Sequence, residues 1–175
     1  MRDGAIDRFS VQENVFLRDH ADRRFRRWIF LKFREMERHA RALVEQYRVK
    51  TPNLAAPLKN LSGGNIQKLI LARELSRRPA VLVAAQPTRG VDIGASEYIH
   101  EMLLAQRDNG TAILLISEDL DEIRTLSDRI AVIYEGRIVG IVERDDARIE
   151  EIGALMAGGS LGSTERRHAE TGIVE

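Results

Sequence analysis

The spacing of hydrophobic residues indicates a helical front to the chain. Between about Asp19 and Tyr47, a stripe with steps of three and four residues predicts one long helix or two short ones; its members are Ile29, Phe33, Met36, Ala40, Leu43 and Tyr47. A coiled-coil seam has similar spacing, but this stripe is short and partly aromatic, which favours a packed helix. The turn residues of 50–53 and Pro57 then end the pattern.

Beyond Pro79 the hydrophobic residues gather in short, β-branched runs that predict strands. These runs are AVLVAA (80–85), TAILLIS (111–117), RIAVIY (129–134) and RIVGIV (137–142). We expect the first two to be fully buried. A predicted helix lies between them, with Ile99, Met102, Leu103 and Gln106 on one face and Asn109-Gly110 at its end, so these two strands should pair in parallel. Glu135-Gly136 should join the last two as a hairpin.

Two shorter helices are expected after these strands. One spans Asp119 to Leu126, and the other begins at a cap formed by Asp145 or Asp146. The expected inward face of the last helix consists of Ile149, Ile152, Leu155 and Met156. The polar segment after Gly159 contains too little apolar surface to fold, so we expect it to be disordered.

Composition narrows the classes of protein to which the chain can belong. The 175 residues contain no cysteine and no apolar run near the roughly 20 residues that span a bilayer, which excludes disulfide, thiolate-metal and membrane-spanning classes. The four histidines lack metal-ligand spacing, so no metal site is assigned. Basic residues predominate in the first 50 positions, but interleaved acidic residues make a solvated helix face a better interpretation than a nucleic-acid patch.

The most informative residues are Asn60-Leu61-Ser62-Gly63-Gly64-Asn65-Ile66-Gln67, directly before a predicted helix. Ser62 is placed as an N-cap, and the two glycines leave backbone N–H groups accessible to an anion at the positive end of the helix dipole. A bare Ser-Gly-Gly also occurs in plain loops. The longer string LSGGNIQKLILAREL is far more specific.

That string resembles the signature motif of ABC transporter ATPases, and the following segments resemble that family in the same order. AVLVAAQPTRGVDIGA (80–95) is similar to the Walker B strand and D-loop, ILLISEDLDEI (113–123) to the switch strand and its helix, and LSDRIAVIYEGRIVG (126–140) to the closing hairpin. The segment PTRGVDIGA most resembles the second ATPase half of the tandem ATP-binding subunits of simple-sugar and nucleoside importers. The resemblance covers about residues 4–158.

Departures from the family pattern imply a degenerate nucleotide site. The chain has no G-x-x-x-x-G-K-[ST], so we expect it to begin inside an ATPase domain, truncated before the signature region. The family's metal-organising Asp and catalytic Glu correspond to Ala85 and Gln86, and its switch His corresponds to Glu118. Losing such a base typically lowers the rate by about 10² to 10⁴. A carboxylate at the switch position would repel the γ-phosphate.

The resemblance implies a P-loop NTPase-like α/β fold with a mainly parallel sheet and a helical subdomain. The expected divisions are 1–60 for the helical subdomain, 61–157 for the signature helix and α/β lobe, and 158–175 for the disordered tail. In this family two ATPase halves pack head to tail, with ATP between the P-loop of one and the signature of the other. The intact positions expected to contact that ATP are Ser62, Gly63, Gly64, Gln67 and, in the D-loop, Asp92.

The implied assembly is an importer at the cytoplasmic face of a membrane. Its partners would be an ATPase half that contains a P-loop and a membrane-spanning permease, and ATP and Mg²⁺ would bind to the assembly and not tightly to the isolated chain. An uncovered sheet edge near 80–85 and 111–117 would also favour self-association. The alternative is a non-enzymatic remnant or regulatory module that binds a partner through its basic, aromatic front. The sequence does not identify the transported solute.

Overall fold

The structure is a computed structural model that describes residues 4–19, 22–28 and 30–159. The chain forms two compact units, Met1–Leu114 and Leu115–Glu175, and each is described by itself. The helices and strands up to the unit boundary are α1 (Val11–Val15), β1 (Arg26–Arg27), β2 (Phe30–Leu31), α2 (Phe33–Gln46), η1 (Leu58–Asn60), α3 (Gly63–Leu75), β3 (Val81–Ala85), α4 (Ile93–Asp108) and β4 (Ala112–Ile116). Those that follow are α5 (Leu120–Leu126), β5 (Arg129–Tyr134), β6 (Arg137–Glu143), η2 (Arg144–Asp146) and α6 (Ile149–Met156).

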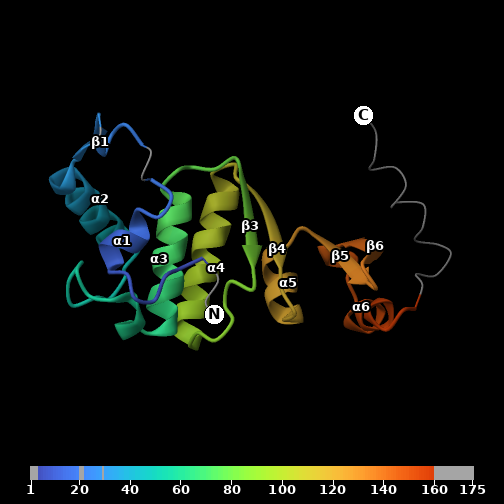
Figure 1. Cartoon of the computed structure of the whole chain (residues 1–175). Coiled ribbons are helices and arrows are strands. Elements are labelled where there is room, and N and C mark those ends of the chain that lie inside the picture. Colours follow the sequence, from blue (N-terminus) through green and yellow to red (C-terminus); the bar gives the residue numbers. More distant parts are fainter. Residues whose placement is uncertain (1–3, 20–21, 29, 160–175) are drawn as a thin grey trace. The chain divides into compact units, whose positions relative to one another are not determined.

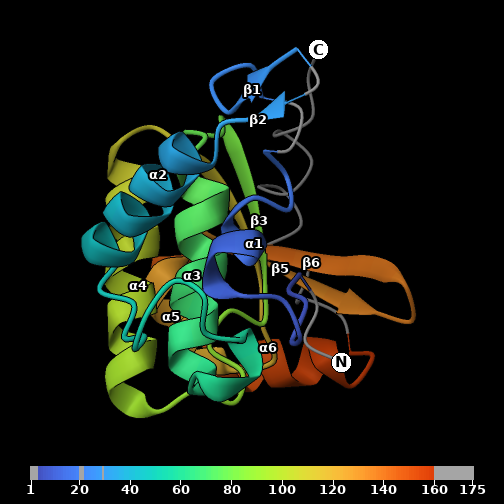
Figure 2. The same ribbon diagram turned by 60° about the vertical axis from the view of Figure 1, so that its left-hand side comes forward.

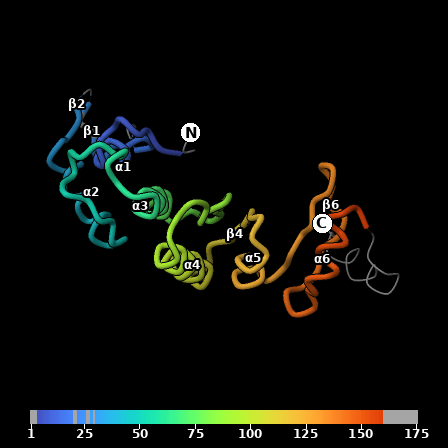
Figure 3. The backbone as a smooth tube through the Cα atoms, turned by 90° about the horizontal axis from the view of Figure 1, so that it is seen from below, coloured from blue at the N-terminus to red at the C-terminus, as the bar shows by residue number. Residues whose placement is uncertain are grey.

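Helix α3 is the centre of the first unit. It packs against α1 and α2 on one side and α4 on the other (Figures 1 and 3). Its buried apolar residues point both ways, as a central helix requires; they are Ile66, Leu69, Leu71, Ala72 and Leu75. The first turn of α3 is therefore held from several sides.

The predicted helix over 19–47 is correct only in its second half. Met36, Ala40 and Leu43 form the buried face of α2. Before α2 the chain folds into an antiparallel hairpin, in which Arg26 pairs with Leu31 and Arg27 with Phe30 (Figure 2). Phe33 is exposed, and Ile29 lies outside the described residues. Aromatic residues favour strands at least as well as helices, so the apolar spacing alone did not distinguish the two.

Strands β3 and β4 form a two-stranded sheet with α4 as the connection between them. The amide of Ala112 donates to the carbonyl of Ala80 at 2.9 Å, so both strands start at the same end and run parallel. The expectation of full burial is wrong. Leu82 and Ala84 are buried, whereas the alternate residues Val81 and Val83 are 63% and 59% exposed, because only one face of this strand is covered.

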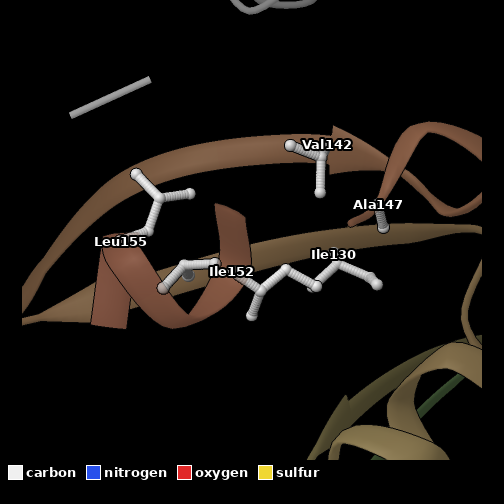
Figure 4. Close-up of a cluster of buried hydrophobic side chains, with 6 residues drawn as sticks. Ile130, Val142, Ala147, Ile152 and Leu155 are labelled. Atoms are coloured by element: carbon white, nitrogen blue, oxygen red, sulfur yellow. The ribbon is translucent and has the colours of Figure 1, made fainter. Parts of the chain in front are cut away.

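The second unit is a hairpin covered by helices. The turn Glu135-Gly136 has φ angles of 46° and 75°, as a two-residue type I′ turn requires, which confirms the predicted hairpin. The buried cluster combines strands β5 and β6 with α6 (Figure 4); it consists of Ile130, Val132, Val142, Ala147, Ile152 and Leu155. Leu120 and Ile123 of α5 pack against that cluster.

Helix ends agree with the sequence in two places and differ in one. Gly110, with a φ of 88°, follows α4, and Asp119 caps α5 through the amides of Asp121 and Glu122. The last helix does not begin at Asp145 or Asp146, which form the 3₁₀ turn η2; its N-cap is Arg148. Consequently Ile149 and Met156, at the two ends of α6, are exposed and only the middle of the expected face is buried.

In the part of the chain that the structure describes, none of the helices is long and apolar enough to cross a membrane. The expected disordered tail falls almost entirely within 160–175, outside the described residues. The expected divisions at 60 and 157 stay a prediction.

Candidate functional site

The signature string forms the start of α3, as predicted. Leu58 of η1 and Leu61 are buried and hold the segment that precedes the helix. Ser62 follows in an extended conformation (φ −65°, ψ 157°) and occupies the N-cap position, and α3 begins at Gly63. The exposed Ser62 side chain is thus presented at the surface on a rigid base.

The Ser62 side chain does not cap the helix. Its Oγ accepts a hydrogen bond from Nδ2 of Asn65 at 2.8 Å, and Oδ1 of Asn65 accepts from the backbone N–H of Lys50 at 2.7 Å. The hydroxyl proton of Ser62 stays available to a ligand. Within the described residues, the backbone N–H groups of Gly63, Gly64 and Asn65 also have no hydrogen-bond acceptor. One hydroxyl and three amides therefore meet at the positive end of a 13-residue helix, a suitable arrangement for phosphate oxygens.

Close packing gives the two glycines a second role. A Cβ on Gly63 would lie 2.9 Å from the carbonyl oxygen of Gly90, and one on Gly64 would lie 2.6 Å from Cβ of Ala95. Both distances are shorter than real Cβ contacts. The glycines thus let the start of α3 contact the loop after β3 and the first turn of α4. The sequence pattern predicted accessible amides but not this contact.

Asp92 lies at the same place in the fold and acts locally as a helix cap. Its Oδ1 accepts from the backbone N–H of Ala95 at 2.9 Å, which caps α4. Its other oxygen, Oδ2, would lie 3.6 Å from a Cβ on Gly64. The structure therefore brings together four of the five predicted contact residues, Ser62, Gly63, Gly64 and Asp92. Gln67 lies one turn further along α3 and is half-buried.

Ala85 and Gln86, the positions predicted to be degenerate, lie at the end of β3 and directly after it, where the chain enters the same loop. Ala85 is the last residue of β3, and its methyl group offers no oxygen to a metal ion. Gln86 adopts a left-handed conformation with a φ of 49°, and its carbonyl accepts from the amide of Arg89 at 3.2 Å, closing a turn. Glu118 is exposed and belongs to the second unit.

Sequence reasoning missed the residues that fix the far end of α3. Arg73 is only 5% exposed, and its guanidinium donates to the backbone carbonyls of Gly4 at 2.7 Å and Asn14 at 3.2 Å. Arg77 pairs with the buried carboxylate of Asp19 at 2.9 Å. No motif marks these arginines, because their acceptors are mainly backbone atoms about 60 to 70 residues earlier in the chain.

A tyrosine between two cations supports the middle of α3. The Lys68 ammonium lies 4.3 Å from the centre of the Tyr98 ring, and the Arg48 guanidinium lies 5.9 Å from it. Burial raises the pKa of the Tyr98 hydroxyl above its usual value, so the ring stays neutral at physiological pH. These contacts stabilise the packing of α3 on α4 behind the signature residues.

The start of α3 fits the phosphate part of a magnesium nucleotide. The start of α3 offers donors of the kind that phosphate oxygens accept. Magnesium requires oxygen ligands, and among the residues that the structure describes no group of three or more His, Asp or Glu side chains is placed to hold a metal ion.

No protein-family model matches the chain, but individual relatives do. It is 44% identical over 160 residues to the nucleoside import ATP-binding protein NupA of Lactococcus lactis, covering 91% of this chain and 32% of that protein. It is 46% identical over 155 residues to the guanosine import ATP-binding protein NupO of Bacillus subtilis, covering 89% and 30%. It is 50% identical over 160 residues to the glucose import ATP-binding protein TsgD13 of Haloferax volcanii, covering 90% and 29%.

Solved ATP-binding cassettes share the fold. The cassette MJ0796, in a dimeric post-hydrolysis state bound to ADP and phosphate, superposes with a TM-score of 0.65 at 20% identity, covering 80% of this chain and 59% of that one. The cassette MJ1267 in its ADP conformation gives 0.61 at 19% identity, covering 96% and 65%. The fold is therefore that of part of an ABC ATPase cassette.

The sequence matches narrow this class. Over about 90% of its length the chain matches ATP-binding proteins of ABC transporters, and the matched members are named for sugar and nucleoside import. The chain spans about a third of the length of these curated relatives.

Proposed function

We propose that the chain supplies the start of α3 to an ATP molecule held by the P-loop of another ATPase half. Ser62, Gly63, Gly64 and Gln67 would contact the phosphates, and Asp92 would face the same interface. The observation that carries this proposal is the Ser62 hydroxyl, which is exposed and unused as a cap beside three amides without acceptors. Charge-assisted hydrogen bonds to a triphosphate would satisfy all four donors.

The nucleotide site of the chain's own half would be degenerate in this proposal. At the positions that correspond to the family pattern, Ala85 would provide no metal ligand, Gln86 would not accept the proton of a water molecule, and Glu118 would replace the switch His by a carboxylate, which repels phosphate. ATP and Mg²⁺ would accordingly be held by the partner half, and the isolated chain would bind them weakly. Hydrolysis would take place at one site of the pair.

The assembly would be an importer of a simple sugar or a nucleoside. The names of the matched relatives, which import nucleosides, guanosine and glucose, support this class of solute. A membrane-spanning permease would complete the assembly at the cytoplasmic face of the membrane. Closure of the two ATPase halves around ATP would then be coupled to the permease.

The test uses a tandem subunit in which this chain forms the second half and the first half has a P-loop, a catalytic Glu and a switch His. With the permease reconstituted, Ser62→Arg should abolish most ATP hydrolysis, because the new side chain blocks the open helix start. Gln46→Arg, which adds the same charge at the exposed end of α2, and Gln86→Ala should leave the steady-state rate nearly unchanged. If Gln86→Ala reduced hydrolysis as much as Ser62→Arg, the single-site proposal would be wrong.

A further inference from the structure

Residues 23–34 have a composition unlike that of any other part of the chain. These twelve positions hold six basic residues, six large apolar residues and no acidic residue. They form the β1–β2 hairpin and lead into the first turn of α2. Because the formal net charge of the whole chain is zero, the positive charge here is a local property.

The structure buries the base of this hairpin and exposes its tip. Phe25 is buried, with its ring centre 4.8 Å from that of Phe16. Beyond it, Trp28 is 83% and Phe30 68% exposed, and Phe33, at the start of α2 next to the hairpin base, is 67% exposed. Figure 2 shows the hairpin projecting beyond the first turn of α2. The apolar tip is therefore presented to the surroundings on a fixed support and not packed into the core.

The described cations that flank the hairpin are mostly without an ionic partner. Arg24 is paired with Asp22 at 2.7 Å. Among the described residues, Arg23, Lys32 and Arg34 form no ion pair, and all three are exposed. The hairpin thus combines exposed aromatic rings with free cations, the two side-chain classes that favour the interface of an anionic membrane.

We propose that the β1–β2 hairpin binds an anionic lipid surface. The aromatic tip would enter the headgroup region, and the flanking basic side chains would pair with lipid phosphates. A fluid lipid layer accommodates a projecting tip without a preformed pocket, whereas a protein partner would have to offer a complementary cavity. Charge complementarity to an anionic surface favours the lipid, and the proposal does not depend on the nucleotide role of α3.

Trp28 is the only tryptophan of the chain and reports directly on this binding. The full chain is titrated with vesicles of phosphatidylcholine and phosphatidylglycerol, and separately with pure phosphatidylcholine. We expect a blue shift of the emission and quenching by brominated lipid with the anionic vesicles, both weakened by added salt. The absence of a shift, or an equal shift with both kinds of vesicle, overturns the proposal. So does a lipid-free blue shift that grows with protein concentration, which would instead indicate a second copy of the chain.

Paired variants distinguish vesicle binding through this hairpin from nonspecific binding by other parts of the surface. Lys32→Gln with Arg34→Gln should lower partitioning into anionic vesicles roughly tenfold or more, since each basic residue near such a surface contributes about a fivefold factor. Phe30→Ser with Phe33→Ser should reduce it further. The matched controls are Lys59→Gln with Arg89→Gln, both exposed basic residues, and Ile133→Ser, an exposed apolar residue of the β5–β6 hairpin. Equal losses in the control variants overturn the proposal.

Discussion

Helices α3 and α4 begin beside each other but use their N-cap residues differently. The side chain of Asp92 accepts a hydrogen bond from the Ala95 amide, so the third amide of α4 is bonded within the protein. Ser62 occupies the equivalent position of α3, yet its hydroxyl accepts from Asn65, and within the described residues the first three amides of the helix have no hydrogen-bond acceptor. A cap used for stability offers nothing to a ligand, whereas an unused cap does. The proposed contact of α3 with a nucleotide depends on this difference.

The largest effect is expected where the two helix starts touch. Gly64→Val would force side-chain atoms into Ala95 and should destabilise the protein by about 1–3 kcal/mol or more, because the contact is already as close as two backbones allow. Gly94→Ala is the matched control, since its Cβ would have only an ordinary 3.6 Å neighbour, Oδ1 of Asp92. Urea unfolding measures both. A Gly64→Val protein as stable as the parent would show that the two helix starts are not in close contact.

A smaller effect on stability is expected when each of the two N-cap side chains is removed. Asp92→Ala should lower the free energy of unfolding by about 0.5–2 kcal/mol, because it removes the cap of α4. Ser62→Ala should change it by only a few tenths, roughly the cost of an ordinary surface substitution. Both variants are measured under the same denaturant conditions. Equal losses of stability for the two variants would mean that Ser62 also stabilises its helix, so the two N-cap residues would not differ in role.

The smallest effect concerns a polar atom that is unpartnered but buried. Nε2 of His39 is buried and has no hydrogen-bond partner among the residues that the structure describes, and the ring centre lies 5.1 Å from that of Phe25. Burial and the nearby Arg24 lower the pKa of His39 below its ordinary 6.5, although Asp19 and Asp22 act in the opposite direction. The unfolded chain therefore binds the proton more readily than the folded one, so stability is complete above pH 6.5 and falls below it.

His39→Phe keeps an aromatic ring and removes this titration. Between pH 7 and 5.5 the variant should lose less stability than the parent, as measured by urea unfolding at each pH. Hydrogen bonds from Ser10 and Arg24 lower the pKa values of Glu13 and Asp22 from ordinary values of 4.5 and 3.8, so their contributions are lost only at more acidic pH. Parallel pH curves for the two proteins would contradict the prediction.

The sequence allowed the strands and the candidate site to be predicted for local reasons. Short β-branched runs between turn residues predicted β3 to β6, and Glu135-Gly136 predicted the hairpin that joins β5 to β6. Ser-Gly-Gly before an apolar helix predicted the start of α3. Each of these signals depends on neighbours within a few positions, which is the range over which turn and cap chemistry acts.

The features that the sequence did not reveal depend on distant contacts. The close packing of Gly63 and Gly64 involves Gly90 and Ala95, roughly 30 positions away, and no local pattern specifies it. The hairpin before α2 was mistaken for helix because its apolar residues suit either structure until a partner strand is formed. The exposed face of β3 was not predicted, because an apolar run does not indicate whether one or both faces of the strand are covered.

The guanidinium of Arg73 also sets an order of events during folding. Its contacts with Asn14 and Gly4 join residues 59 and 69 positions apart, so the first segment of the chain closes a long loop when it docks on α3. Contacts of such separation form after local helices, because the chain loses more conformational freedom in making them. Residues 4–19 should accordingly gain protection from hydrogen exchange later than α3 during refolding, and lose it first when the native protein opens locally.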